Sequence, residues 1–106
     1  SGIAVIRVSG KSTAEVVKKI TGTKLPSPRV ATLTKFNKNG AKELIDEGVI
    51  IWFPAPNSYT GEDLAEFHVH GSRAVIKAMH SAISKIKSCR LAEPGEFTKR
   101  AFVMAN

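Results

Sequence analysis

The sequence predicts an α+β domain with a mixed or largely antiparallel sheet and two main helices. Short runs rich in β-branched residues alternate with two longer stretches in which apolar residues recur every three or four positions. An Asn39-Gly40 pair, a strong signal for a tight hairpin turn, separates two of the short runs. The length of 106 residues, with 42% hydrophobic and 24% charged residues, matches a single domain with one core.

The first predicted element is a buried strand, Ile3–Val8, whose apolar run is interrupted only by Arg7. The Gly10-Lys11-Ser12 that follows has the form of the end of a phosphate-binding loop. That motif also requires a glycine five positions earlier, where this sequence has Val5, so a nucleotide-binding loop is not predicted. The segment could still receive a lone anion at the start of the next helix.

A helix is predicted after Ser12, which precedes Glu15 with the spacing of a capping box, and Gly22 is a typical C-terminal stop. Two strands, Arg29–Phe36 and Leu44–Phe53, flank the hairpin turn and are predicted to pair in antiparallel fashion.

The second half of the chain continues this alternation. Its predicted elements are a loop over 54–63, a strand over Leu64–His70, a helix over Arg73–Lys87, a short strand over Arg90–Ala92, a turn at Pro94-Gly95, and the first turns of another helix over Thr98–Met104. Met79 falls on the apolar stripe of the helix over 73–87 and is predicted to be a core residue.

The net charge of +7 is unevenly distributed along the sequence. Residues 11–42 hold eight basic residues and one acidic residue, 43–67 hold six acidic and no basic residues, and 68–106 hold seven basic and two acidic residues. Basic segments around an acidic stretch suit a protein that handles an anionic partner, but solvated helix faces would give the same pattern.

A single cysteine, Cys89, cannot form an internal disulfide, which is typical of a domain from a reducing compartment. No paired base is evident beside it, so Cys89 is interpreted as a packing residue and not as a nucleophile. No apolar run approaches the roughly 20 residues that span a bilayer, so a soluble domain without membrane contact is expected.

Strand alternation places Leu64, Glu66, His68 and His70 on one face of their strand. A carboxylate and two imidazoles on one face raise the possibility of a metal site. Residues two apart on a strand lie about 6.6 Å apart, which can seat two ligands, but a third firm ligand is not evident. A surface or packing role for the histidines is the simpler interpretation, and no metal site is predicted; the same holds for His80.

Arg7 and Glu66 are the two charges predicted within central strands, where an isolated charge is costly. One interpretation is a structural ion pair between them. The other is a ligand site, because a carboxylate matches two adjacent N–H donors on a pterin or guanine edge and an arginine matches a carbonyl or a carboxylate.

Three segments carry a resemblance to a known family: IAVIRVSG at 3–10, FPAPNSYTGEDLAEFHVHG at 53–71 and AEPGEFTKRAF at 92–102. Their order and spacing resemble the N-terminal domain of the MnmE/TrmE family of tRNA modification GTPases over nearly the entire chain. The resemblance implies an α+β domain similar to the tetrahydrofolate-binding domain of aminomethyltransferases, which pairs with a second copy near the folate.

The resemblance also implies a cofactor and partners. Formyl- or methylene-tetrahydrofolate would supply a one-carbon unit for modification of the wobble uridine of tRNA, together with a flavoprotein of the MnmG/GidA type. GTP, potassium and magnesium would belong to a separate GTPase domain, so this domain itself is not expected to be catalytic. The bacterial cytoplasm and the mitochondrial matrix are both compatible with the family.

By matched position, the family's folate contacts fall on Arg7 and Glu66. The resemblance implies that Glu66 holds the N–H edge of the pterin and that Arg7 donates to the same ligand. It also implies a TrmE-type domain over residues 1–106 that is shortened at both ends, without a later folate-contacting lysine and without the helical and GTPase domains. Two alternative functions are a basic module that binds tRNA and a structural dimerisation domain in which Arg7 and Glu66 satisfy each other.

Overall fold

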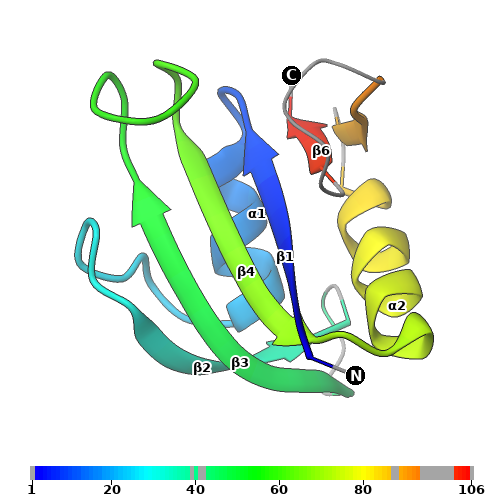
Figure 1. Ribbon diagram of the computed structural model, residues 1–106. Helices are drawn as coiled ribbons and strands as arrows, with labels where there is room; N and C mark the ends of the chain where they lie inside the picture. Colours follow the sequence, from blue (N-terminus) through cyan, green and yellow to red (C-terminus); the bar gives the residue numbers. More distant parts are fainter. Residues whose placement is uncertain (1, 39, 41–42, 87–88, 94–101, 106) are drawn as a thin grey trace.

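The computed structural model describes residues 2–38, 40, 43–86, 89–93 and 102–105 and shows helices packed on a sheet (Figure 1). In chain order its elements are β1 (Ile3–Ser9), α1 (Thr13–Thr21), β2 (Thr32–Asn37), β3 (Leu44–Phe53), β4 (Leu64–His70), α2 (Arg73–Ser84), β5 (Cys89–Leu91) and β6 (Phe102–Ala105). The predicted α+β class, with two main helices, is confirmed.

The strands form one mixed sheet in the order β2-β3-β4-β1-β6-β5. The first four strands pair in antiparallel fashion, β1 and β6 run parallel, and β5 closes the far edge antiparallel to β6. In the β1–β4 ladder, Arg7 lies directly opposite Glu66, and on the other side of β4 Glu66 lies opposite Ile51 of β3. This register brings together two residues that are 59 positions apart in the sequence.

One face of the sheet is covered by helices. Both helices lie on the same side, with α1 behind the strands in Figure 1 and α2 along their right-hand edge. The covered face carries fully buried apolar side chains from four strands, among them Ile6, Phe36, Ile50 and Phe67. Phe36 and Phe67 contact each other edge to face, with ring centroids 5.4 Å apart.

Helix α1 begins and ends where the sequence predicts. Val16, Val17 and Ile20 are buried, and Gly22 adopts a left-handed conformation with φ of 71° while its N–H donates to the carbonyl of Lys18. The capping box is not formed, because the Ser12 side chain makes no capping hydrogen bond.

Helix α2 begins at Arg73 as predicted and ends at Ser84, three residues earlier than predicted. Its N-cap is Ser72, whose Oγ accepts a hydrogen bond from the Val75 N–H at 3.1 Å. Met79 is fully buried, which confirms its predicted place in the core.

The last element differs from its prediction. The sequence predicts the first turns of a helix over 98–104, but Phe102–Ala105 is strand β6, which pairs with both β1 and β5. Residues 98–101 and the predicted turn at 94–95 lie outside the described part of the chain. The helix prediction is therefore wrong over 102–104. The backbone groups of β1 on this side need partners, and β6 supplies them.

The loop between β3 and β4 is tied to the end of β1. The backbone carbonyl of Asp63 accepts hydrogen bonds from the Gly10 N–H at 3.0 Å, the Ser9 hydroxyl at 3.1 Å and the Thr13 hydroxyl at 3.3 Å. Ser9 Oγ is also 2.7 Å from Thr60 Oγ1. Gly10 has φ of 124°, which side chains rarely adopt, and this conformation lets the chain turn from β1 into α1 at the anchored loop.

Candidate functional site on the open face of the sheet

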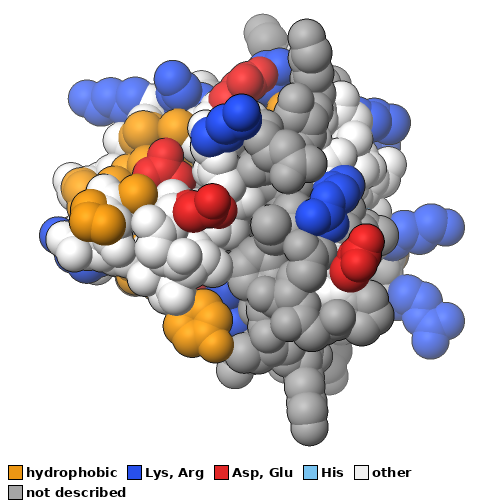
Figure 2. Space-filling view, turned by 90° about the horizontal axis from the view of Figure 1, so that it is seen from above, with side chains coloured by type: hydrophobic (Ala, Val, Ile, Leu, Met, Phe, Trp, Pro, Cys, Tyr) orange, Lys and Arg blue, Asp and Glu red, His pale blue; other side chains and the backbone are white. Residues whose placement is uncertain are grey.

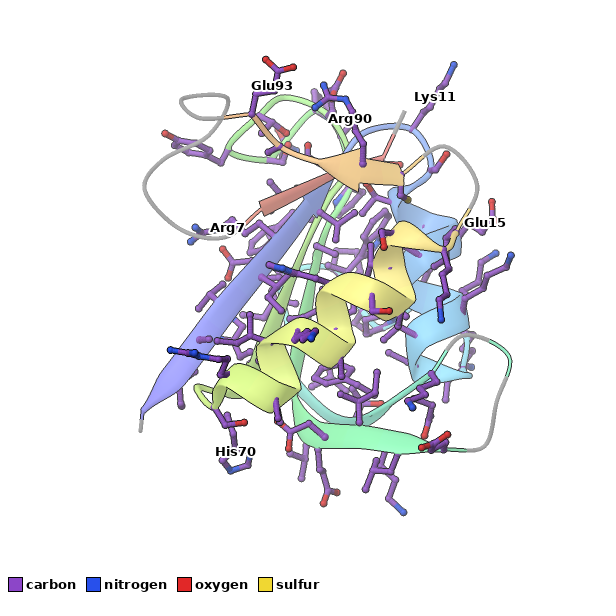
Figure 3. All side chains as sticks on the ribbon, turned by 90° about the vertical axis from the view of Figure 1, so that its right-hand side faces the viewer. Arg7, Lys11, Glu15, His70, Arg90 and Glu93 are labelled. Carbon is purple, nitrogen blue, oxygen red and sulfur yellow. The ribbon has the colours of Figure 1, made fainter. Side chains whose placement is uncertain are left out.

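The face of the sheet turned away from the helices, which we call the open face, carries a cluster of three polar side chains. Arg7 Nε donates to Glu66 Oε2 at 2.7 Å, and Glu66 Oε1 lies 2.9 Å from His68 Nε2. Strand β1 supplies Arg7, and β4 supplies Glu66 and His68. Figure 3 shows Arg7 projecting on the side of β1 opposite to α2.

The cluster is only partly accessible to solvent. The side chains of Arg7 and Glu66 are 19% and 15% exposed. Burial by itself would raise the pKa of Glu66, but the hydrogen bonds from Arg7 and His68 outweigh it and hold this pKa below its usual value. Glu66 is therefore an ionised carboxylate at neutral pH, with both oxygens oriented by neighbours.

Apolar residues surround this cluster. The strand register places Val5 and Ile51 on the same face as Glu66, one on each side of β4, and Val49 beside His68. These residues are half-buried, whereas Ile3 and Leu33, at the periphery of the face, are 74% and 70% exposed. The open face thus presents an ion pair flanked by apolar side chains, and no described element covers it.

The sequence predicts either a structural ion pair or a ligand site at Arg7 and Glu66. The structure brings both residues together, as each interpretation requires, and joins them directly, as the ion-pair interpretation states. A carboxylate has about four lone-pair positions, so the two observed bonds do not exhaust the acceptor capacity of Glu66. The direct contact is therefore compatible with a ligand that adds further bonds.

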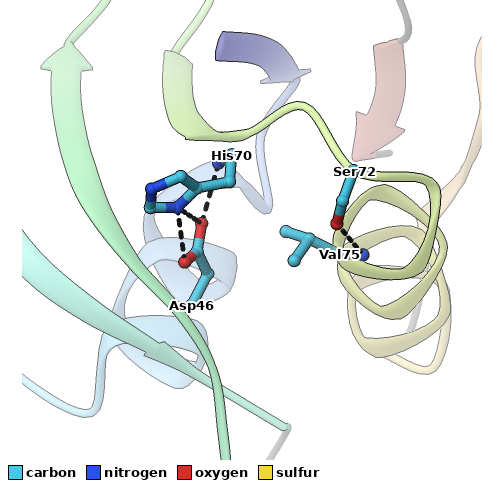
Figure 4. Close-up of polar contacts among 4 residues, drawn as sticks. All are labelled: Asp46, His70, Ser72 and Val75. Atoms are coloured by element: carbon cyan, nitrogen blue, oxygen red, sulfur yellow. Dashed lines mark hydrogen bonds and ion pairs between the residues drawn. The ribbon is translucent and has the colours of Figure 1, made fainter. Parts of the chain in front are cut away.

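His70 does not join this cluster. Its Nδ1 lies 2.8 and 3.0 Å from the two carboxylate oxygens of Asp46, and its backbone N–H donates to Asp46 Oδ2 at 2.8 Å (Figure 4). Among the described residues, no three His, Cys, Asp or Glu side chains are grouped so that they could hold a metal ion. Figure 4 also shows the N-cap bond of α2, from Val75 to Ser72.

Two other candidate residues lie elsewhere. Cys89 is half-buried against the core, and burial raises the pKa of its thiol, which fits the packing interpretation. His80 lies on α2, where burial lowers its pKa and leaves its Nε2 without a hydrogen-bond partner in the described structure. Sequence reasoning did not identify either the Asp46–His70 contact or the buried Nε2, since both depend on tertiary packing.

Basic and acidic side chains both lie on the end of the molecule that Figure 2 shows. Figure 2 shows the end that carries the β3–β4 loop, where hydrophobic and acidic side chains gather on one side and lysine and arginine side chains project from the outline. Tyr59 and Glu62, both exposed, belong to this loop. The described surface visible in that view does not form a continuous basic patch. None of the described helices is long and apolar enough to cross a bilayer.

Comparison with known proteins decides the family. The family described as GTP-binding protein TrmE N-terminus matches residues 1–106. The chain belongs to this family. The predicted resemblance to the MnmE/TrmE N-terminal domain is thereby confirmed.

Individual members of the TrmE family are close in sequence. The chain is 68% identical over 102 residues to the tRNA modification GTPase MnmE of Pelagibacter ubique. The matched region covers 96% of this chain and 23% of that protein. It is 50% identical over 101 residues to the mitochondrial 5-taurinomethyluridine-(tRNA) synthase subunit GTPB3 of Danio rerio, a match that covers 95% of this chain and 20% of the relative. It is also 50% identical over 103 residues to MnmE of Brucella canis, a match that covers 96% of this chain and 23% of the relative. The chain thus spans about a fifth of the length of these relatives.

Proposed function

We propose that this chain is the tetrahydrofolate-binding and homodimerisation domain of a GTPase that modifies the wobble uridine of tRNA. The observation that carries the proposal is the ionised Glu66 carboxylate, held by Arg7 and His68 beside apolar side chains of the open face. Family membership supports the context, since the relatives bear the names of tRNA-modifying proteins.

The chemistry of the cluster fits a reduced pterin. The pterin edge offers adjacent N–H donors, which a carboxylate with two oriented oxygens can accept. The Arg7 guanidinium supplies a cationic donor for a carbonyl of the same ring system, and the half-buried Val5 and Ile51 offer apolar surface for the ring. When bound, the folate would supply a one-carbon unit, while these residues bind and orient it.

The surroundings of the cluster fit a dimer. Exposed Ile3 and Leu33, together with half-buried Val49 and Ile51, leave apolar side chains of the open face in contact with water. A second copy placed against this face would bury them and would lower the water content around Arg7 and Glu66, which strengthens both charge-assisted bonds to a ligand.

The full-length protein would add the remaining parts. We propose that a GTPase domain with potassium and magnesium, a flavoprotein partner of the MnmG/GidA type and tRNA act with this domain. We also propose a fold relationship to the tetrahydrofolate-binding domain of aminomethyltransferases. The names of the relatives support a bacterial cytoplasmic or a mitochondrial location.

Titration with 5-formyltetrahydrofolate in a calorimeter tests the folate site. We expect binding to the unmodified chain and a rise in its melting temperature, because a ligand selective for the native state stabilises it. Loss of one charge-assisted contact costs about 1.5–3 kcal/mol, so Glu66→Gln should weaken binding roughly ten- to hundredfold. Glu62→Gln, in the exposed loop, is the matched control and should leave the affinity unchanged.

The direct Arg7–Glu66 bond favours a second candidate, a structural dimerisation domain without folate. In that case 5-formyltetrahydrofolate would leave the melting temperature unchanged, while sedimentation would still show a dimer that Leu33→Asp disrupts. Unchanged folate affinity in a folded Glu66→Gln variant would remove Glu66 from the folate site.

A further inference from the structure

A groove runs along α2, on the side of this helix that faces the β2–β3 hairpin. It has a volume of about 550 Å³ and is lined by Lys38, Ala74, Lys77, Ala78, Ser81, Ala82 and Lys85. Four of these residues have small side chains and lie on successive turns of α2, so they form a shallow floor. From Ala74 to Lys85 the groove follows about 16 Å of helix, which is three turns.

The rim of the groove is positively charged. Lys77 of α2 and Lys85, the C-cap of this helix, are exposed, and Lys38 belongs to the β2–β3 hairpin. Helix α2 contains no acidic residue over its 12 positions. Among the described side chains, only Lys38 of these three lysines has an ion-pair partner, Glu43 at 3.1 Å. Two lysines are thus available on one helix face, separated by two turns.

The shape of the floor indicates what fits there. Small side chains let a second helix approach closely and lay an apolar ridge along the groove, as in helix-in-groove recognition. A nucleic acid backbone is polar throughout and would leave the alanine methyl groups in contact with phosphates, which gains nothing from their burial. Figure 3 shows α2 across the front of the molecule, with no other described helix or strand lying over it.

We propose that this groove docks an acidic amphipathic helix of a partner protein. The apolar stripe of that helix lies on Ala74, Ala78 and Ala82, and its flanking carboxylates meet Lys77 and Lys85. This surface is separate from the Arg7–Glu66 cluster, so its occupation does not depend on folate binding or on dimerisation through the open face.

The test uses a synthetic helical peptide of about 18 residues, with one leucine stripe flanked by glutamates, added to the ¹⁵N-labelled chain. We expect amide shifts centred on Ala74, Ala78 and Ala82 and a measurable affinity by fluorescence anisotropy. Lys77→Glu combined with Lys85→Glu should weaken binding about tenfold or more, because two attractive contacts become repulsive. The double variant Lys18→Glu with Lys24→Glu makes the same change of net charge on exposed residues outside the groove and should bind normally.

Shape is tested separately from charge. Ser81 is exposed, so Ser81→Phe should fold and fill the groove without changing its charge, and it should abolish binding. The proposal is overturned if the peptide causes no shifts, if the shifts map outside α2, or if both double variants lose equal affinity. It is also overturned if an RNA hairpin, or a second copy of the chain, occupies the groove in preference to the peptide.

Discussion

Replacing Arg7 and Glu66 singly and together should reveal a strong coupling between them. Their side chains are 19% and 15% exposed and are joined at 2.7 Å. At an effective dielectric constant of 20, the Coulomb attraction at this distance is about 6 kcal/mol. The lost hydration of both groups offsets much of it, which leaves a net coupling of about 1.5–3 kcal/mol.

The assay is a double-mutant cycle with Arg7→Met and Glu66→Gln, measured by urea unfolding at pH 7. The surface pair Lys19–Glu15 provides the control: it lies at 3.1 Å with side chains 45% and 52% exposed, so its coupling should stay below about 0.5 kcal/mol. Equal coupling in the two pairs would refute the reasoning.

The same cycle should depend on pH in a defined direction. The pKa of Glu66 is held below the usual 4.5 by Arg7 and His68, so the unfolded chain takes up this proton first as the pH falls. The coupling should therefore be fully present above pH 4.5 and decline below it. A coupling that grows on acidification would contradict this assignment of charge.

Three further predictions concern the scaffold. Gly48→Ala should destabilise the fold by about 3 kcal/mol or more in urea unfolding, because its Cβ would lie 2.0 Å from the backbone oxygen of His68. A loss of unfolding free energy under about 1 kcal/mol would mean that β3 and β4 move apart easily at this position. Burial lowers the pKa of His80, so the free energy of unfolding should fall as the pH drops from 7 to 5. His80→Leu should reduce this dependence on pH in urea unfolding, and an equal pH dependence in the variant and the unmodified chain would argue against burial of His80 as its cause. Ser72→Ala removes the N-cap bond to Val75 and should lower the free energy of unfolding by about 1 kcal/mol. The midpoint of urea unfolding should fall while the dependence of the unfolding free energy on urea concentration stays the same, and an unchanged midpoint would show that this cap adds no stability.

Elements with a clear local pattern could be predicted from the sequence. Strand β4 occupies the predicted Leu64–His70, and α1 stops at the predicted C-cap Gly22, because period-two alternation and a left-handed glycine are both properties of short segments. The hairpin over β2 and β3 also follows from local turn chemistry. The family followed from long motifs, and the two charged residues of the candidate site were conspicuous within apolar strands.

Other features were decided by contacts between distant segments. Phe102–Ala105 became strand β6 because the exposed edge of β1 needs hydrogen-bond partners, a requirement that local helix signals cannot report. The sequence by itself determined that Arg7 and Glu66 are charges inside strands, and so required a partner for each. Only the tertiary structure decided that they face each other at 2.7 Å, since the register of β1 against β4 is a property of two strands packed together.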